Sequence, residues 1–527
     1  MELKQVCCFQ VLEVLATAAR SYENPVLDQR VVVELAGPGG SQAEVDAFWD
    51  GGRAWRFRFS PTVPGEWQYR LRCQGPADPG LDGISGAFVA QPYEGDNPLY
   101  RHGPVCLSPN RRYLQHADGA PFLWMADTAW NGVLKARPED WKFYLQRRRQ
   151  QGFSAVQFVL TQWRAYKQDS QGEKAFEDSV RLRVNPAFFQ RLDAKVSAVN
   201  EAGLLAVPVL LWAIAGEDNP GYTLSEEAAI ALARYMVARY GAYQVAWILA
   251  GDGDYRGPKA SRWQRIGRAV FAGRHDRLVT MHPQGLHWVA DEFRGEEWFD
   301  FIGYQSGHGD SEQDLRFLVA GPPASEWRIP PPRPIINLEP NYEGHLAYQS
   351  RQPFTACHVR RALHWSLLVA PTAGVSYGHH GIWPWMEERG VPPDHPHSGE
   401  AIPWSEALES HGASAVGVLV RFLSGLPWWQ LAPAQELLAS QPGEQDLARW
   451  AMVAATPRRQ LVVAYTPKGE PLQLRASELA LPAAASWFDP RSGAWAEAEA
   501  LEETDQAELT LSPPSEEDWV LCLRSAG

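Results

Sequence analysis

Between about residues 96 and 432, eight short apolar segments alternate with longer segments of helical periodicity. The apolar segments contain many aliphatic, β-branched and aromatic residues, as expected of strands buried on both faces, and several run into clusters of Gly, Asp, Gln or His. Eight strands in βα order are the number that a closed barrel requires, so this region predicts a (β/α)8 TIM barrel. The segments are residues 120–130, 153–163, 204–214, 244–255, 277–285, 299–309, 334–340 and 373–383.

The two ends of the chain have a different pattern. Residues 1–95 contain short alternating segments separated by Gly- and Pro-rich turns, and residues 433–527 return to the same spacing. Such spacing is typical of β-sandwiches. Because 527 residues are too many for one core, we predict an N-terminal β-sandwich (1–95), a catalytic barrel (96–432) and a C-terminal β-sandwich (433–527).

Acidic residues follow two of the predicted barrel strands. Residues 244–255 end in Asp252 and Asp254, and residues 334–344 release Glu339 and then Glu343. The C-terminal ends of barrel strands line the active site of this fold. Two acids at two strand ends are what glycoside hydrolysis needs, one to protonate the leaving oxygen and one to attack or to activate water.

The composition of the chain favours some classes of binding partner and argues against others. The 23 Trp residues favour carbohydrate, because sugar rings stack on aromatic rings, although Trp-rich cores give the same count. A net charge of −13 argues against nucleic acid, which selects basic surfaces. No run approaches eighteen apolar residues, so no membrane span is expected. Gln10 and Glu13 interrupt the apolar stretch a signal peptide needs. We therefore expect a cytoplasmic enzyme, with a trimmed secreted form as the alternative.

Residues 48–72, FWDGGRAWRFRFSPTVPGEWQYRLR, resemble the small β-sandwich that precedes the barrel in a group of bacterial glycoside hydrolases. The C-terminal segment resembles the β-domain that follows such barrels and is sometimes labelled collagen-binding. Six motifs in the barrel, in order, resemble the apiosidase-like barrels of glycoside hydrolase family 140 and its relatives in clan A. They are residues 118–131, 246–252, 280–285, 299–308, 336–344 and 373–383.

This resemblance implies roles for two acids. In the family an Asp after the fourth strand is the acid/base and a Glu after the seventh is the nucleophile, which here fall on Asp252 and Glu339. The chain departs from the family pattern at Ala250 and Leu338, where the family has Gly, and these changes could reshape the pocket. The alternative for both acids is that they cap the helices after their strands.

The chemistry imposes opposite demands on the two acids. Asp252 would need its pKa raised by burial and by the charge of Glu339 in order to act as an acid. Glu339 must stay ionised, which hydrogen bonds from Asn337, Tyr304 or His282 would favour. A retaining mechanism requires the two carboxyl groups about 5 to 5.5 Å apart.

Further polar and aromatic residues at predicted strand ends are interpreted as sugar contacts, with plain packing as the alternative for each. Asp254 and Glu343 are interpreted as supporting residues or turn formers, and Asp127 as either a sugar contact or an N-cap. The predicted contacts are Asp127, Trp130, Gln162, Trp163, Trp212, His282, Tyr304, Gln305, His308, Tyr377, His379 and Trp383.

Other chemistries fit less well. Residues 374–378, GVSYG, match a serine nucleophile elbow, but Pro384 blocks the helix that must follow. Residues 252–257 begin like a calcium loop, but Arg256 stands where an oxygen ligand is needed. The histidines lack metal-site spacing, so neither a metal nor a cofactor is predicted.

The sequence thus predicts a retaining glycoside hydrolase that cleaves a terminal bond in a plant or microbial glycoside. Exo action is inferred from the Trp- and Pro-rich loop 383–404, which could wall off one end of the site. The alternative is a non-catalytic carbohydrate-binding or scaffold protein built on the same barrel. The sequence does not indicate which sugar is cleaved or how many copies of the chain associate.

Overall fold

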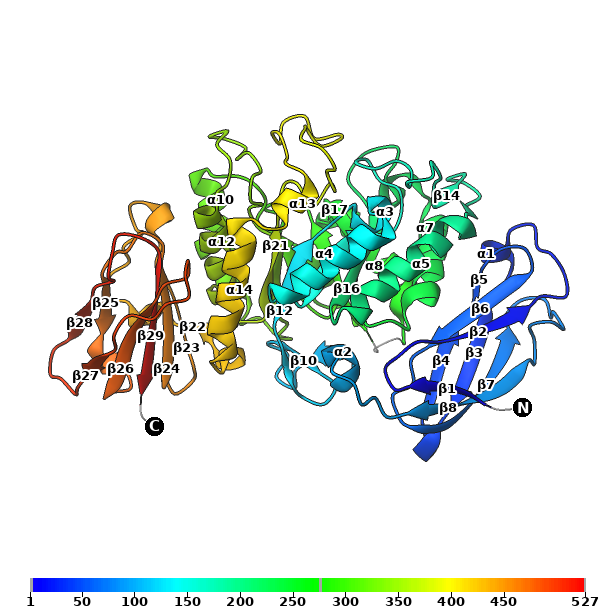
Figure 1. Ribbon diagram of the computed structural model, residues 1–527, viewed down its shortest axis with the longest axis horizontal. Helices are drawn as coiled ribbons and strands as arrows, with labels where there is room; N and C mark the ends of the chain where they lie inside the picture. The colour runs from blue at the N-terminus through cyan, green and yellow to red at the C-terminus, as the bar shows by residue number, and fades with distance from the viewer. Residues whose placement is uncertain (1–2, 274–276, 526–527) are drawn as a thin grey trace.

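The computed structural model describes residues 3–273 and 277–525. Three parts follow one another along the long axis of the molecule: an N-terminal β-sandwich, a central barrel and a C-terminal β-sandwich (Figure 1). The barrel occupies the middle, so each sandwich packs against a different side of it.

The N-terminal sandwich places a five-stranded sheet, in the order β1-β8-β7-β3-β4, against a three-stranded sheet, β2-β6-β5. Its core is aromatic, with Trp67 stacked on Phe88 at 6.3 Å between ring centres. The segment containing Gln10 and Glu13 belongs to this sandwich. The strands are β1 (Lys4–Cys7), β2 (Leu12–Thr17), β3 (Val31–Ala36), β4 (Gln42–Asp46), β5 (Phe48–Trp49), β6 (Ala54–Phe59), β7 (Gly65–Cys73) and β8 (Ser85–Gln91), with α1 (Pro25–Asp28) and the 3-10 turn η1 (Pro38–Gly40) between them.

Eight parallel strands form the central sheet, in the order β18-β17-β16-β13-β12-β21-β20-β19. Each lies inside one of the eight apolar segments, so the predicted barrel is confirmed. The strands are β12 (Trp124–Thr128), β13 (Ala155–Val159), β16 (Leu205–Trp212), β17 (Ala246–Gly253), β18 (Leu278–Pro283), β19 (Ile302–Gln305), β20 (Ile335–Glu339) and β21 (Gly374–Gly378).

The two end strands of this sheet, β18 and β19, are joined through the side chain of Thr280. Thr280 Oγ1 donates to the carbonyl of Phe301 (2.7 Å) and accepts from the backbone N–H of Gly303 (3.0 Å). The hydroxyl thus provides, across this gap, the bonds that a backbone ladder provides elsewhere in the sheet.

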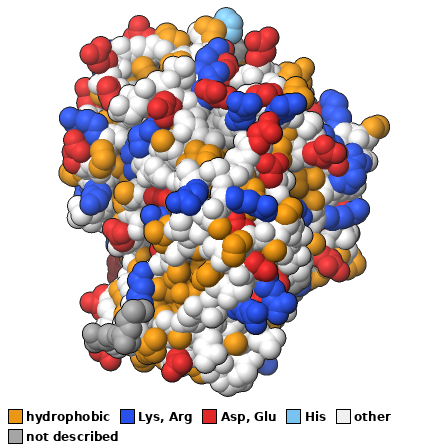
Figure 2. Space-filling view, turned by 90° about the vertical axis from the view of Figure 1, so that its right-hand side faces the viewer, with side chains coloured by type: hydrophobic (Ala, Val, Ile, Leu, Met, Phe, Trp, Pro, Cys, Tyr) orange, Lys and Arg blue, Asp and Glu red, His pale blue; other side chains and the backbone are white. Residues whose placement is uncertain are grey.

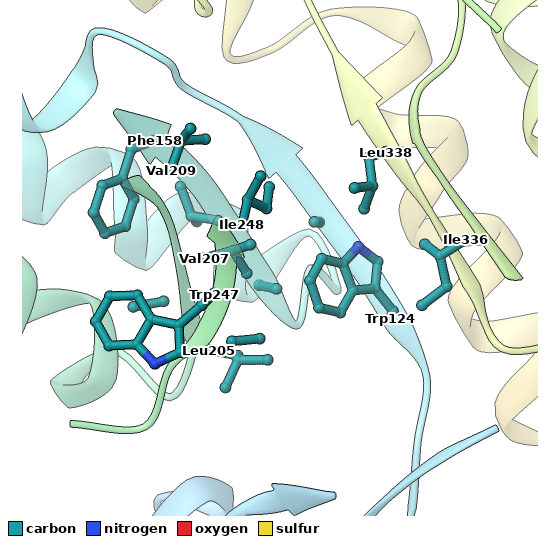
Figure 3. Close-up of a cluster of buried hydrophobic side chains, with 14 of the residues drawn as sticks. Trp124, Phe158, Leu205, Val207, Val209, Trp247, Ile248, Ile336 and Leu338 are labelled. Carbon is teal, nitrogen blue, oxygen red and sulfur yellow. The ribbon is translucent and has the colours of Figure 1, made fainter. Parts of the chain in front are cut away.

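Large apolar side chains fill the barrel. Figure 3 shows Trp124 facing Val207 and Ile248 across the interior, with Ile336 and Leu338 beside it. A layer of polar side chains lies within this core: Gln157 donates to Thr128 Oγ1 and to the carbonyl of Leu338, and Ser376 donates to Gln157. Because these buried polar groups bond to one another, they specify the packing instead of weakening it.

Helices surround the sheet, and most begin at a residue suited to that position. Asn185, Ser225, Ser311 and Ser410 cap long helices with their side chains, satisfying backbone N–H groups that have no helical partner. The helices are α3 (Gly132–Lys135), α4 (Pro138–Gln150), α5 (Pro186–Glu201), α6 (Pro220–Thr223), α7 (Glu226–Tyr240), α8 (Ala260–Phe271), α9 (Ala290–Phe293), α10 (Glu312–Ala320), α11 (Pro322–Glu326), α12 (Ala356–Leu368), α13 (Trp404–Ala407) and α14 (His411–Ser424).

Short elements complete the barrel region. Before the first barrel strand lie α2 (Pro98–Arg101) and a three-stranded sheet of β9 (Val105–Leu107), β10 (Leu114–His116) and β11 (Pro121–Phe122). A two-stranded ribbon, β14 (Phe176–Glu177) with β15 (Arg183–Val184), follows β13.

In the C-terminal sandwich a six-stranded sheet, β22-β23-β24-β29-β26-β27, packs on a two-stranded antiparallel sheet, β25-β28. Arg360 of α12 binds both oxygens of the buried Asp518 (2.7 and 2.8 Å), which fixes this domain to the barrel. The strands are β22 (Ala432–Pro433), β23 (Met452–Ala455), β24 (Leu461–Thr466), β25 (Leu472–Arg475), β26 (Ala483–Phe488), β27 (Glu499–Leu501), β28 (Glu508–Leu511) and β29 (Trp519–Ser525).

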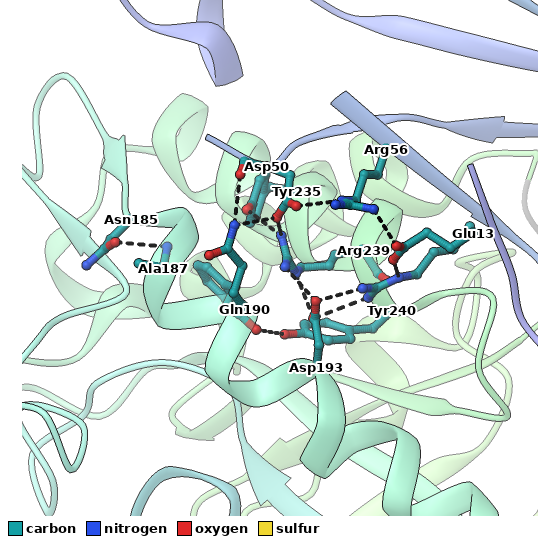
Figure 4. A network of polar contacts seen from close by, with 12 residues as sticks. Glu13, Asp50, Arg56, Asn185, Ala187, Gln190, Asp193, Tyr235, Arg239 and Tyr240 are labelled. Atoms are coloured by element: carbon teal, nitrogen blue, oxygen red, sulfur yellow. Dashed lines mark hydrogen bonds and ion pairs between the residues drawn. The ribbon is translucent and has the colours of Figure 1, made fainter. Parts of the chain in front are cut away.

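A network of ion pairs fixes the N-terminal sandwich to the barrel (Figure 4). Arg58 of β6 binds Asp193 of α5 (2.7 Å), and Arg239 of α7 binds both Asp193 (2.6 Å) and Asp50 of the sandwich (2.9 Å). The two arginine side chains are almost fully buried, so each charge depends on its partners. The sandwich is therefore attached by specific contacts as well as by its linker.

The outer face of this end of the molecule is mixed in charge. In Figure 2, acidic and basic side chains lie interspersed over the surface turned toward the viewer. Among the described residues, no helix combines the length and the apolar character needed to cross a membrane.

Candidate active site

Asp252 stands at the C-terminal end of β17, where the strand departs from regular geometry. The pairing of β17 with β18 shifts register on both sides of Gly251, and Asp252 has a φ of 53°, in the left-handed region. A Cβ at Gly251 would lie 2.6 Å from the ring of Trp212, so glycine is required here. Bulges of this kind re-aim a side chain at the rim of a barrel, and here they orient Asp252.

Glu339 ends β20 and is contacted by two histidines. His308 Nδ1 accepts from the backbone N–H of Tyr342 (3.4 Å), so its Nε2 carries the proton and donates to Glu339 Oε1 (3.0 Å). His282 Nε2, at the end of β18, lies 3.2 Å from Oε2 but off the direction of a hydrogen bond. Neither ring nitrogen of His282 has a hydrogen-bond partner among the described residues.

The two acids have opposite pKa shifts. Burial, followed by the negative charge of Glu339, raises the pKa of Asp252 to about 6. Burial would also raise the pKa of Glu339, but its contacts with His282 and His308 outweigh burial and hold that pKa well below its usual value. The negative charge of Glu339 thus acts on Asp252, and near neutral pH Asp252 can hold a proton while Glu339 is ionised.

Arg164, on the loop after β13, was not predicted from the sequence. Its guanidinium Nη2 lies 3.8 Å from Asp252 Oδ2 and donates to His395 Nε2 (2.9 Å). His395 Nδ1 in turn donates to the carbonyl of Pro393 (2.9 Å), which fixes the tautomer that accepts from Arg164. Loop 383–404 is thereby fastened beside the acids.

Four of the predicted tryptophans form a connected aromatic wall. Trp212 packs against Trp163 at 4.4 Å and Trp130 at 5.4 Å, and Trp163 reaches Trp383 at 6.3 Å. Trp130 also meets His282 edge to face at 5.3 Å. The wall therefore continues to the histidine that contacts Glu339.

Two tyrosines near Glu339 were also missed. Tyr342 is buried, packs on His308 at 4.5 Å, and its hydroxyl has no hydrogen-bond partner among the described residues. Tyr348 is 56% exposed, and its ring lies 5.9 Å from that of His308. His308 in turn contacts Glu339, so the exposed ring of Tyr348 lies one residue away from that carboxylate.

Three predicted sugar contacts face away from the site, and these predictions are corrected. Asp127 is fully buried against α4, bound by Arg148 (2.5 Å) and by the hydroxyl of Tyr144 (2.6 Å). Tyr377 pairs in register with Asp127 and shares its outward face, where its hydroxyl binds Glu343. The ring of Tyr304 points away from the barrel interior and packs on Phe317 of α10 and on Trp288, which follows β18. Side chains alternate along a strand, so all three lie between sheet and helices.

Asn337 also faces outward, donating to Ser306 and Ser366. Neither it nor Tyr304 supports the ionised state of Glu339; the histidines take that place.

Other predicted residues hold loops. Gln162 accepts from the backbone N–H of Ala175 (2.9 Å), and His379 Nδ1 accepts from that of Gly381 (2.9 Å). The side-chain amide of Gln162 is used inside the protein, which corrects that prediction. The bond to Gly381 engages only Nδ1 of His379, so His379 stays a predicted sugar contact. Gln305 differs: it pairs in register with Glu339, and its side-chain oxygen has no hydrogen-bond partner among the described residues. Gln305 stays a predicted sugar contact.

The alternative acids have supporting roles. Asp254 forms ion pairs at the surface with Arg256 (2.9 Å) and Lys259 (2.7 Å). Glu343 accepts from the backbone N–H of Gly412 with both oxygens, which caps the start of α14. Ser376, at the centre of the elbow-like motif, is sealed in the barrel core. Within residues 3–273 and 277–525, no group of three or more His, Cys, Asp and Glu side chains is arranged to hold a metal ion.

Comparison with protein families agrees with this architecture. The family model described as "Apiosidase-like, catalytic domain" matches residues 108–430, more than half of the chain. Residues 5–74 match "Domain of unknown function (DUF5060)", and residues 432–524 match "Putative collagen-binding domain of a collagenase". No curated protein matches the chain.

Solved structures share the fold. A glycoside hydrolase family 5 protein from Bacteroides vulgatus has a TM-score of 0.70 at 22% identity, covering 82% of this chain and 95% of the other. A second structure from that organism, titled a "putative glycoside hydrolase", has a TM-score of 0.72 at 18% identity and covers 99% of both chains. At these identities the likeness concerns the fold alone. The family assignment rests on the match over residues 108–430, and by that match this protein belongs to the apiosidase-like family of glycoside hydrolases.

Proposed function

We propose that this glycoside hydrolase cleaves a terminal glycosidic bond with retention of configuration. Asp252 protonates the leaving oxygen and then, as a base, activates water. Glu339 attacks the anomeric carbon and forms a covalent glycosyl intermediate that this water releases. The observation that carries the proposal is the position of Asp252 and Glu339 at the C-terminal ends of β17 and β20, with Arg164 beside Asp252 and His308 bound to Glu339. The opposite pKa shifts of the two acids support it.

The depressed pKa of Glu339 favours attack over base catalysis. A general base works best when its pKa lies near the working pH. Contacts with His282 and His308 hold the pKa of Glu339 well below its usual range, which makes it a weak base. A weakly basic carboxylate can still attack a developing oxocarbenium ion and later leave, so the nucleophile of a retaining mechanism is the better assignment.

The surroundings support action on a chain end. The hydrogen bond between Arg164 and His395 fastens loop 383–404 beside Asp252, and Trp383 and Trp163 extend the aromatic wall toward this loop. Because loop 383–404 is held on one side of Asp252, the site accommodates the terminal sugar of a glycan more readily than an internal sugar whose chain continues in both directions. The family match supports a sugar of the kind released by apiosidases as the first substrate to test.

The stereochemistry of the product tests the mechanism. Proton NMR of the first product formed from an aryl glycoside should show the anomer of the substrate, whereas the opposite anomer would establish inversion. A 2-deoxy-2-fluoro aryl glycoside should leave a stable adduct on Glu339, located by mass spectrometry of the digested protein.

Variants test the residue assignments. Glu339→Gln should abolish turnover, and unchanged turnover would remove Glu339 from the mechanism. Asp252→Asn should lose hydrolysis of poor leaving groups, while azide with a good leaving group restores turnover and gives a glycosyl azide of retained configuration. Asp254→Asn is the matched control, because Asp254 lies two residues from Asp252 but pairs with Arg256 and Lys259 at the surface.

A further inference from the structure

A cavity lies between α14 and the C-terminal sandwich. Its volume is about 590 Å³, within the range of small-molecule sites. It is lined by Arg421 and Phe422 from α14, Phe488 from β26, Arg524 from β29, and Trp495 from the loop between β26 and β27. Figure 1 shows α14 between the barrel and the sheet that carries β26 and β29.

This cavity is remote from the acids. Helix α14 begins beside Glu343, which caps it, and the cavity is lined by residues from its second half, Val418–Gly425. Arg421 follows Gly412, the residue that Glu343 contacts, by nine residues, which is about 14 Å along a helix. The cavity is therefore a separate place on the molecule, and its role does not rest on the proposed mechanism.

An exposed indole forms part of the cavity wall. Trp495 is 46% exposed, although it packs on Phe488 at 5.0 Å and on Phe422 at 5.7 Å. Phe422 and Phe488 stack on each other at 4.6 Å, so the indole rests on a firm aromatic base. Fixed, half-exposed indoles offer an apolar face at low entropic cost, and the C–H face of a sugar ring fits such a face.

Two guanidinium groups accompany the indole. Among the described residues, neither Arg421 nor Arg524 forms an ion pair, although the chain carries 62 acidic against 49 basic side chains. The guanidinium carbon of Arg524 lies 5.9 Å from the centre of the Trp495 ring. Guanidinium groups that have no carboxylate partner favour an anionic ligand, and their planar fork matches a carboxylate.

We propose that this cavity binds a uronic acid unit of a glycan. The sugar ring stacks on Trp495 while its carboxylate is bound by Arg421 and Arg524. Stacking alone would accept any sugar, and cations alone would accept any anion. An exposed indole beside two guanidinium groups without carboxylate partners favours a ligand that has both a ring face and a carboxylate.

Calorimetry on the full chain tests the proposal, with a uronic acid tetrasaccharide as the probe and its methyl ester as the uncharged match. The acid should bind at least tenfold more tightly than the ester, because hydrogen bonds between charged partners are about twice as strong as neutral ones. Arg421→Gln with Arg524→Gln should weaken binding of the acid about tenfold or more, and Trp495→Ala should weaken binding of both probes. Arg458→Gln, an exposed arginine elsewhere in the same domain, should leave binding unchanged.

Turnover of a small aryl glycoside by each variant reports that the barrel is intact, because none of the substituted residues lies near Asp252. Equal affinity for acid and ester would overturn the proposal, as would the absence of binding. Binding that the double arginine variant leaves unchanged would place the ligand at Glu339 instead. Equally tight binding of tetraglutamate would identify a site for acidic peptides, which also contradicts the proposal.

Discussion

The charge of Arg164 should set the upper limit of the pH range in which the enzyme works. If Asp252 is the acid, kcat/KM requires its protonated form, so activity is present below its pKa of about 6 and is lost as the pH rises through that value. The positive charge of Arg164 lowers this pKa. Replacing Arg164 with glutamine should therefore raise the pKa of Asp252 and move the alkaline limb of the pH profile upward.

The geometry gives the size of the shift. Two unit charges about 3.8 Å apart attract by about 1 kcal/mol in a water-like dielectric and by about 4 kcal/mol at an effective dielectric constant of about 20. Since about 1.4 kcal/mol corresponds to one pKa unit, the limits are about one and three units. The Arg164 and Asp252 side chains are 27% and 15% exposed, so the pair is mostly buried and the bulk-water value is a lower limit. We expect the limb to move from about pH 6 to about pH 7 or above.

The assay is kcat/KM for an aryl glycoside between pH 4 and 9. Lys167→Gln is the matched control. It removes a positive charge from the same loop, but Lys167 pairs with Asp218 and not with Asp252. Arg164→Lys should restore much of the native limb, which separates the effect of charge from the loss of the bond to His395. An alkaline limb that stays in place in Arg164→Gln, or moves down, would refute the assignment of Asp252 as the acid or of Arg164 as its neighbour.

Three further perturbations test other parts of the structure. Gly251→Ala drives a methyl group into the ring of Trp212, and thermal unfolding should show a loss of about 1–3 kcal/mol together with reduced kcat; unchanged stability would show that the bulge tolerates a side chain. Asp127→Asn leaves Arg148 buried without its ionic partner, so urea unfolding should show a loss of about 3–5 kcal/mol while KM of the folded enzyme is unchanged; a raised KM would restore Asp127 as a sugar contact. Tyr348→Ala should raise KM several-fold with little effect on stability, because the ring is exposed; an unchanged KM would remove Tyr348 from the substrate.

The strands could be predicted from the sequence, but the direction of their side chains could not. In the sequence, a parallel strand that is buried on both faces is a continuous run of apolar residues. Residues 120–130 therefore carry no alternation that separates the interior, where Trp124 and Thr128 point, from the helix side, where Asp127 points. Once Trp124 is known to fill the barrel, the two-residue period places Asp127 outside it. The same reasoning explains the errors at Tyr304 and Tyr377.

Loop residues near the acids were missed for another reason. Arg164 and Tyr348 follow strands by several residues, and no local pattern fixes where such side chains lie. Their positions depend on tertiary contacts, such as the bond from Arg164 to His395 and the bond from the backbone N–H of Tyr348 to the carbonyl of His308. By contrast, Asp252 and Glu339 end their strands directly, and the barrel fold alone brings them to one rim.

The departure from the family pattern at Leu338 lies in the barrel core, below the carboxylate of Glu339. Leu338 points into the barrel core, where a Cβ on Gly303 would lie 2.5 Å from its Cδ1. The absence of a side chain at Gly303 therefore makes room for the larger residue, and the core stays filled. Glu339, the next residue, is oriented by His308 and His282 from neighbouring strands. Because packing below and hydrogen bonding above are supplied by different residues, the core can vary at position 338 while the carboxylate of Glu339 keeps its contacts.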